Sequence, residues 1–300
     1  MEFNYENASL HFLRTGGPRG FVWKYALAYT VLSIAFLGLM MLMFSGFYMT
    51  VFGSIASGDT SSLESSQNMG GVILMYLVMI PLSLIFYAVF ETSYLRRYMH
   101  GDGFKLRLGR DELNVFVVLL IWTAIMIGLF IVFGIIVAIA GVSSMAGFSE
   151  ENPAVNPIGF MVMFFAYIAL FGAMGFLGVR FGPAAALTVR DGRIRFFDAW
   201  DVTRGRWWVL FGAYSAWWMM AFIAYFFVVM ILVGFTLPFS MAIENGSPTA
   251  GAGALVGMFL FYLLLLPAGA CFYYIWAGPA ALAAKTDPRY LASQSSGDEL

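Results

Sequence analysis

The chain has 300 residues, of which 61% are hydrophobic, 18% are aromatic and only 11% are charged. A soluble domain usually carries about 25% charged residues, and its core cannot hide this much apolar side-chain surface from water. The composition therefore excludes an ordinary soluble protein and indicates one whose apolar surface faces lipid. The net charge of −1 says little as a total, but the order of the charges along the chain is informative.

Six apolar stretches are each long enough to cross the hydrocarbon layer as a helix, which takes about 20 residues. Their interiors contain no histidine and no charged residue, and one charge at a helix centre costs about 2.5–3.5 kcal/mol on insertion scales. The sequence therefore predicts an all-α integral membrane protein. Its six or so transmembrane helices are expected at residues 23–52, 71–94, 113–141, 158–180, 207–236 and 253–281.

We expect one transmembrane domain over residues 23–284, preceded by a cytoplasmic segment over residues 1–22. The polar start and the long first apolar stretch do not fit a cleavable signal peptide, so the first helix is expected to remain as a span. Residues 285–300 are polar enough that we expect a disordered cytoplasmic tail. The single cysteine, Cys271, excludes a disulfide within the chain and a cluster of thiolate metal ligands.

Basic residues avoid one set of connections and fill the other. The connections 53–70, 142–157 and 237–252 contain acidic residues but no lysine or arginine, so all 16 basic residues lie elsewhere in the chain. Cytoplasmic connections of membrane proteins carry an excess of lysine and arginine. The pattern therefore predicts that both termini are cytoplasmic.

A short motif recurs at a spacing of roughly 96 residues. Gly182-Pro183-Ala184-Ala185 corresponds to Gly278-Pro279-Ala280-Ala281, while the equivalent place after the second span, residues 91–94, lacks the Gly-Pro pair. We interpret the chain as three helix hairpins related about an axis along the membrane normal. Chance likeness of alanine-rich helix ends is the alternative. The three repeats would cover residues 19–109, 110–203 and 204–284.

Helix breakers lie at similar depth in the second, fourth and sixth spans. They are Pro81, Gly172 and Pro267. Proline removes a helix hydrogen bond and kinks the chain, so we consider these three residues candidate helix hinges.

The cytoplasmic connections have the pattern of segments that lie in the membrane interface. Asp191-Gly192 predicts a turn, and Ile194, Phe197 and Trp200 follow at helical spacing. Such a helix places its apolar side on the membrane and its basic side against anionic headgroups. Membrane lipids are therefore the expected partners, by general anchoring or through a specific phosphate or lipid-head site. Candidate contacts are Arg96, Arg97, Lys105, Arg107, Arg190, Arg193, Arg195, Arg204 and Arg206.

Residues 182–187 (GPAAAL) and 199–208 (AWDVTRGRWW) resemble a pattern of bacterial multi-span membrane proteins, including the membrane domain attached to some glycerophosphodiester phosphodiesterases. The resemblance covers roughly the second half of the chain and implies a location in the bacterial cytoplasmic (inner) membrane. In those fused enzymes the chemistry belongs to a separate soluble barrel with acidic residues and histidines. This chain lacks that barrel, so the resemblance implies no phosphodiesterase activity.

Few residues are candidates for catalysis. His11 and His100 do not have the spacing of a metal-binding pair, so no metal or cofactor is expected. Membrane-embedded catalysis would require Glu91, His100 and Asp102 to converge. Glu91 and Arg180 are the deepest ionisable groups, and their place near the span ends favours interface anchoring over ion coupling.

By elimination, we expect a non-enzymatic inner-membrane protein that acts in membrane assembly, scaffolding or envelope lipid homeostasis. Anionic lipid or an unidentified protein is the expected partner, and nucleic acid is not. The alternative is a carrier or channel for an uncharged or amphipathic solute, because repeated hairpins with broken helices are typical of carriers. Such a carrier requires a continuous polar cavity between the repeats.

The predicted topology can be tested with reporter fusions at Ser62, Glu151 and Asn245, one in each connection that lacks basic residues. Because positive charge is retained in the cytoplasm, all three fusions should report the external side. Periplasmic alkaline phosphatase activity is the measurement. A cytoplasmic signal from any one of the three positions would overturn the topology.

Overall fold

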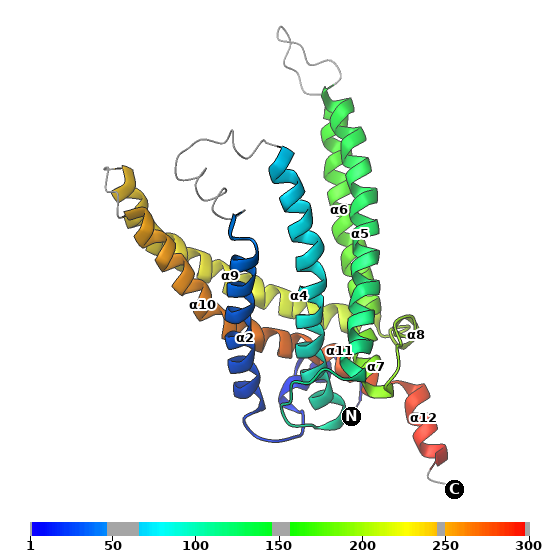
Figure 1. Ribbon diagram of the computed structural model, residues 1–300. Helices are drawn as coiled ribbons and strands as arrows, with labels where there is room; N and C mark the ends of the chain where they lie inside the picture. Colours follow the sequence, from blue (N-terminus) through cyan, green and yellow to red (C-terminus); the bar gives the residue numbers. More distant parts are fainter. Residues whose placement is uncertain (1, 47–65, 146–156, 245–249, 298–300) are drawn as a thin grey trace.

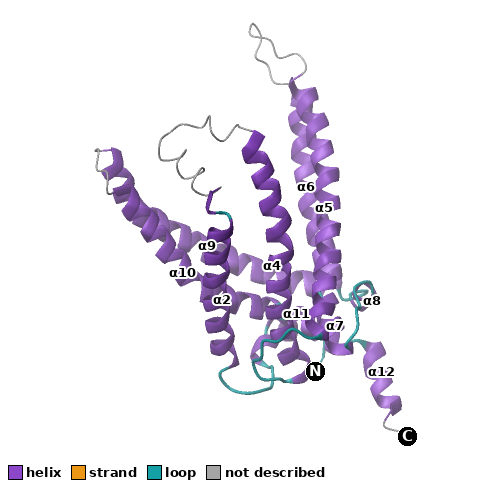
Figure 2. Ribbon diagram, viewed as in Figure 1, coloured by secondary structure: helices purple, strands orange, loops and turns teal. Residues whose placement is uncertain are grey.

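The computed structural model describes residues 2–46, 66–145, 157–244 and 250–297, and the regular structure in these ranges is helical throughout, with no strand (Figures 1 and 2). The three connections at residues 47–65, 146–156 and 245–249, which include the fusion positions Ser62, Glu151 and Asn245, lie outside the described residues. Six helices are long and apolar enough to cross a membrane, which confirms the predicted all-helical, six-span membrane protein. They are α2 (Phe21–Met43), α4 (Ser66–His100), α5 (Arg110–Met145), α6 (Pro157–Phe181), α9 (Trp207–Glu244) and α10 (Ala250–Trp276).

Six short helices gather at the end of the molecule where both chain termini lie (Figure 1). We call this the basic end, because its helices and loops carry most of the basic residues. Large side chains that are fully buried, such as Tyr25, Tyr98 and Leu187, belong to its core. The short helices are α1 (Tyr5–Ser9), η1 (His11–Leu13), α7 (Ala184–Asp191), α8 (Asp198–Val202), α11 (Gly278–Lys285) and α12 (Pro288–Gly297).

The long helices pack as neighbours and spread apart away from the basic end (Figure 1). Helix α5 packs against α6, and α9 against α10, as antiparallel hairpins. Helix α2 packs against α10, and α4 against α5, so these contacts join different hairpins. Few residues in the apolar parts of the six helices are buried, as expected for surfaces that face lipid.

Two of the three expected repeat copies end in the same way. Helix α6 ends at Phe181, and the chain restarts as α7 after Gly182-Pro183; likewise α10 ends at Trp276, and α11 starts at Gly278 with Pro279 in its first turn. Proline fits the first turn of a helix because its missing N–H has no partner there. At the equivalent place, α4 runs through residues 91–94 without interruption. The threefold repeat therefore stays a prediction.

The three candidate hinges lie inside helices. Helix α4 continues through Pro81, α6 through Gly172 and α10 through Pro267, and α9 contains a further proline, Pro238. A transmembrane helix tolerates proline where neighbouring groups satisfy the freed carbonyl.

The C-terminal tail differs from the expectation. Residues 285–300 were expected to be disordered, but residues 288–297 form α12. The reason is an N-terminal cap: the Asp287 carboxylate accepts a hydrogen bond from the backbone N–H of Arg289 at 3.2 Å, and Pro288 starts the helix.

A buried ion pair fixes α4 to the start of α5. Arg96 and Glu112 are only 4% and 2% exposed and form a short hydrogen-bonded pair. Arg96 also donates to the carbonyl oxygen of Lys105 at 3.1 Å, and Glu112 accepts from the backbone N–H of Gly109 at 2.9 Å. The second contact is half of a capping box, because Glu112 lies three residues after Gly109 at the helix start. The pair therefore shapes the whole loop from α4 to α5.

The Glu112→Gln substitution should destabilise the protein by about 3–5 kcal/mol, because it leaves the Arg96 guanidinium buried without its counter-charge. The measurement is the thermal unfolding midpoint of detergent-purified protein. Arg107→Ala is the matched control: that side chain is 55% exposed and contacts the same carboxylate at 3.6 Å, so it should cost at most about 1 kcal/mol. Equal losses in the two variants would contradict the assignment.

Candidate functional site

A cavity of about 670 Å³ lies between the long helices next to the basic end. Its walls come from α4, α5, α6, α9 and α10, and α7 and α11 close the end near the short helices. Most of the wall is apolar, with Leu95, Val118, Trp122 and Met174 among its residues. Cavities of this size and character are typical of sites for small apolar or amphipathic molecules.

Small residues create this space. Gly175 and Gly178 on α6 line the cavity, and a Cβ at either position would meet no atom within 4 Å. Gly182 has the opposite role, because a Cβ there would lie 2.8 Å from the Tyr214 hydroxyl. Glycine at 182 therefore lets Tyr214 approach α6, while Gly175 and Gly178 leave the volume beside it empty.

The cavity has an open side between α6 and α9. Phe171 on α6 is 67% exposed and Trp218 on α9 is 66% exposed, although both line the cavity. Lining residues on α4, α5 and α7, such as Tyr94, Val118 and Ala186, are buried. Helices α6 and α9, which flank this open side, are both candidate membrane spans.

Polar groups occupy one part of the wall. Glu91 and Tyr94 come from α4, and Tyr214 and Ser215 come from α9. Glu91 is close enough to the phenols of Tyr94 and Tyr214 to interact with them electrostatically. Within the described residues, the Glu91 carboxyl has no hydrogen-bond or ion-pair partner, and no lysine, arginine or histidine lines the cavity.

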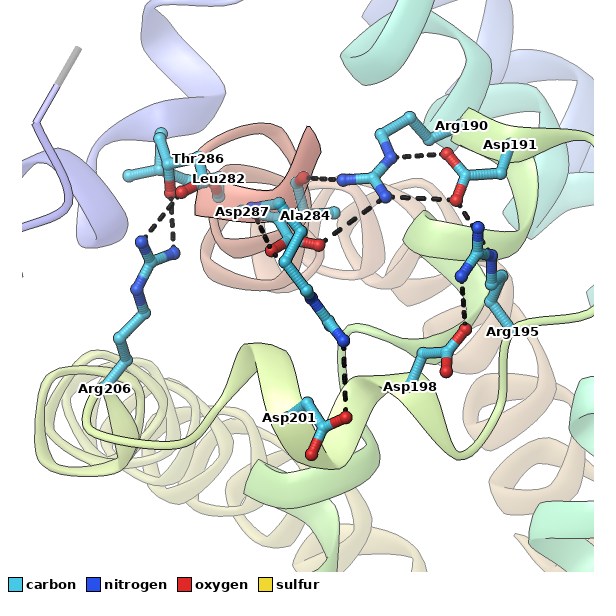
Figure 3. Close-up of polar contacts among 11 residues, drawn as sticks. Arg190, Asp191, Arg195, Asp198, Asp201, Arg206, Leu282, Ala284, Thr286 and Asp287 are labelled. Carbon is cyan, nitrogen blue, oxygen red and sulfur yellow. Dashed lines mark hydrogen bonds and ion pairs between the residues drawn. The ribbon is translucent and has the colours of Figure 1, made fainter. Parts of the chain in front are cut away.

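A second candidate site is a cluster of arginine and aspartate side chains at the basic end (Figure 3). Arg190 pairs with Asp191 at 2.7 Å and with Asp287 at 3.7 Å, and it also donates to the Ala284 carbonyl oxygen. Arg195 pairs with Asp191 at 3.0 Å and with Asp198 at 2.7 Å. The hydrogen bond that Arg195 donates to Asp198 raises the pKa of Arg195 above its usual value, so that arginine remains charged.

The same cluster ties α12 and the end of α11 to α7 and α8. Arg289 in α12 pairs with Asp201 in α8 at 3.3 Å, and Arg206 donates to the Thr286 carbonyl oxygen at 2.7 Å (Figure 3). A hollow of about 510 Å³ lies within the cluster. Arg190, Arg195 and Arg289 in its wall already pair with aspartates, so the arrangement is better suited to holding the helices together than to binding a free anion.

The structure places the candidate headgroup contacts in three groups. Arg96 and Arg190 are buried in ion pairs, so their interpretation as lipid contacts is wrong; buried arginine keeps its charge by pairing with a carboxylate. Arg97, Arg195 and Arg206 are half-buried and hydrogen-bonded within the protein. The candidates whose side chains are exposed at the basic end are Lys105, Arg107, Arg193 and Arg204.

The three residues considered for catalysis, Glu91, His100 and Asp102, have different surroundings in the structure. Glu91 faces the cavity, whereas the His100 ring is exposed, with its Nε2 3.4 Å from the Val189 carbonyl oxygen, and Asp102 is exposed in the following loop. Among the described residues, no group of three histidine, cysteine, aspartate or glutamate side chains could hold a metal ion. Sequence reasoning found Glu91 but missed the cavity, whose signal was the spacing of Gly175, Gly178 and Gly182.

Comparisons of the chain with protein-family models, with curated proteins and with solved structures give no match. The resemblance of residues 182–208 to bacterial multi-span proteins therefore stays a prediction. The class that the fold defines is a multi-span helical membrane protein.

His11 holds the N-terminal segment against the basic end. Its ring is 3% exposed and stacks on Tyr98 with 5.5 Å between the ring centroids. Neither ring nitrogen has a hydrogen-bond partner among the described residues. Burial, together with the positive charges of Lys285 and Arg14, lowers the pKa of His11 from 6.5 to about 4.

Acid should therefore destabilise the wild-type protein between about pH 6.5 and pH 4. Unfolded His11 binds a proton below pH 6.5 while the folded form resists protonation until about pH 4, so stability falls as pH falls through this window. The loss is up to about 3 kcal/mol. In His11→Phe, the thermal unfolding midpoint should depend less on pH across this window than it does in wild type. His100→Gln, at the exposed histidine, should keep the wild-type acid sensitivity, and an unchanged slope in His11→Phe would contradict this account.

Proposed function

We propose that this protein is a non-enzymatic membrane protein that binds an amphipathic molecule, and that it acts in envelope lipid homeostasis. The single observation that supports this most directly is the apolar cavity of about 670 Å³ with its open side between α6 and α9. A molecule that is dissolved in the bilayer can enter such a site without crossing water. Membrane assembly and scaffolding, the other roles that the sequence allows, give no reason for an empty cavity of this size.

The arrangement of the cavity favours binding over catalysis. Its polar groups are one carboxyl group and a few hydroxyl and indole groups, and they occur at the edge of a large apolar wall. General acid–base catalysis needs partners within hydrogen-bonding reach of one another, and Glu91 has no such partner among the described side chains. The same pattern, one polar point beside an apolar volume, matches a molecule with a small head and a hydrocarbon chain.

The exposed arginines and lysine at the basic end support a fixed orientation in a bacterial inner membrane. Lys105, Arg107, Arg193 and Arg204 are exposed there, and each basic side chain near an anionic surface contributes about 1 kcal/mol of attraction. We propose that this end is cytoplasmic and contacts anionic headgroups. The cavity then lies in the cytoplasmic half of the membrane.

A carrier for an uncharged or amphipathic solute is the second candidate. It is supported by the proline-containing helices α4, α9 and α10, because interrupted helices around a central site are common in carriers. Against it, the wall of the cavity is mostly apolar, while a carrier for a polar solute needs a continuous polar path. A solute that moves through this cavity would therefore be amphipathic as well.

Filling the cavity tests the proposed function. Gly175→Leu places a side chain in open space within the cavity, and Gly128→Leu, on α5 outside the cavity wall, is the matched control because a Cβ there also meets nothing within 4 Å. After gentle detergent extraction, native mass spectrometry should detect a bound amphipathic molecule on wild type and Gly128→Leu. Gly175→Leu should retain at least about tenfold less of this molecule than wild type, because the added side chain occupies the site.

Equal retention by Gly175→Leu and Gly128→Leu would show that the bound molecule lies elsewhere. A wild-type protein that carries no amphipathic molecule, and takes none up from added lipid extract, would overturn the proposal.

A further inference from the structure

Among the described residues that line the cavity, Glu91 is the only one with a carboxyl group. It lies in α4 within a membrane-spanning segment, and no described residue supplies a hydrogen bond or a counter-charge to it. A carboxylate without a partner is costly in apolar surroundings, and ionisable residues inside membrane segments are therefore rare and mark ligand or ion sites. A ligand that binds in this cavity can therefore supply the counter-charge that Glu91 lacks.

The cavity contains nothing that would recognise a phosphate. Phosphate groups bind to arginine, lysine or backbone N–H groups, and no arginine, lysine or histidine lines this wall. A negatively charged headgroup beside Glu91 would also repel it. The basic side chains that suit anionic lipids are exposed at the basic end instead, so the two surfaces favour ligands of opposite charge.

We infer that the cavity binds a lipophilic primary amine, with the ammonium group against Glu91 and the hydrocarbon chain between α6 and α9. This inference rests on the proposed function, since it names the class of amphipathic molecule for the same cavity. The ion pair satisfies the Glu91 carboxylate, which has no partner among the described residues. The chain replaces the empty apolar volume beside Gly175 and Gly178.

The remaining polar groups fit an ammonium head. Such a group has three N–H donors, and after one is bound to Glu91 the hydroxyl oxygens of Tyr94, Tyr214 and Ser215 are the acceptors available in the wall. Trp276 lies between Tyr214 and Trp218, with ring centroids 4.9 Å and 5.9 Å away. Aromatic faces attract cations, most strongly when water is excluded.

The experiment compares two probes of equal chain length, dodecylamine and dodecanol. Binding is measured by equilibrium dialysis against the full-length protein in lipid nanodiscs, and empty nanodiscs correct for partition into lipid. Wild type should bind the amine at least about tenfold more tightly than the alcohol, because a charge-assisted hydrogen bond is stronger than a neutral one. Glu91→Gln should lose that preference while its affinity for dodecanol stays within about threefold of wild type.

Glu91→Gln keeps the shape of the side chain, and unchanged dodecanol binding also shows that the variant is folded. If it does not fold, Glu91→Asp is the second variant: it keeps the carboxylate on a shorter side chain, so it should bind the amine more weakly than wild type while dodecanol binding stays unchanged. Equal binding of the two probes by wild type would overturn the inference, and so would an unchanged amine preference in Glu91→Gln, or unchanged amine binding in Glu91→Asp where that variant is used. Any of these results means that Glu91 does not pair with the ammonium group.

The failure of this inference can be distinguished from the failure of the proposed function. If Gly175→Leu blocks dodecanol binding but wild type shows no amine preference, the cavity binds amphipathic molecules and only the amine assignment is wrong. If wild type binds neither probe, both proposals are wrong.

Discussion

A bilayer provides no solvent for charged side chains, and this constraint governs where charge occurs in the molecule. Most charged side chains lie at the basic end, and those that are buried there are paired. Arg96 with Glu112 joins α4 to α5, and Arg190 with Asp191 and Asp287 joins α7 to the chain between α11 and α12. The long helices spread apart beyond this end (Figure 1), so the packed core and the ion pairs at the basic end hold the bundle together.

Glu91 differs from the paired residues Arg96 and Arg190, and its carboxyl group determines which ligands the cavity favours. It is a carboxyl group within a membrane span, it faces an apolar volume, and no described side chain pairs with it. The ion pairs of Arg96 and Arg190 show that charges buried in this protein can be paired within the chain. A partner that comes from outside the chain explains why Glu91 differs, and the lateral opening between α6 and α9 gives that partner a route from the lipid.

The nine basic residues that were candidates for lipid contact have different roles in the structure. Nine basic residues were candidates for lipid contact on charge alone, yet Arg96 and Arg190 are buried in ion pairs and only some of the others are exposed. Charge and spacing cannot separate these cases, because a buried arginine and an exposed arginine look alike in a sequence. The partner decides the role, and partners such as Glu112 and Asp287 come from other parts of the chain.

The sequence by itself determined the number of spans and the helical class, since hydrophobic length alone dictates which segments cross a bilayer. It did not indicate the helix break near Gly278: the expected sixth span ran through this position to residue 281, whereas α10 ends at Trp276 and α11 starts at Gly278. The cavity was decided only by the tertiary structure, since its wall combines α4, α5, α6, α9 and α10. The α12 helix was missed for a related reason: its cap at Asp287 is local, but Arg190 and Asp201, which pair with Asp287 and Arg289, are far away in the chain.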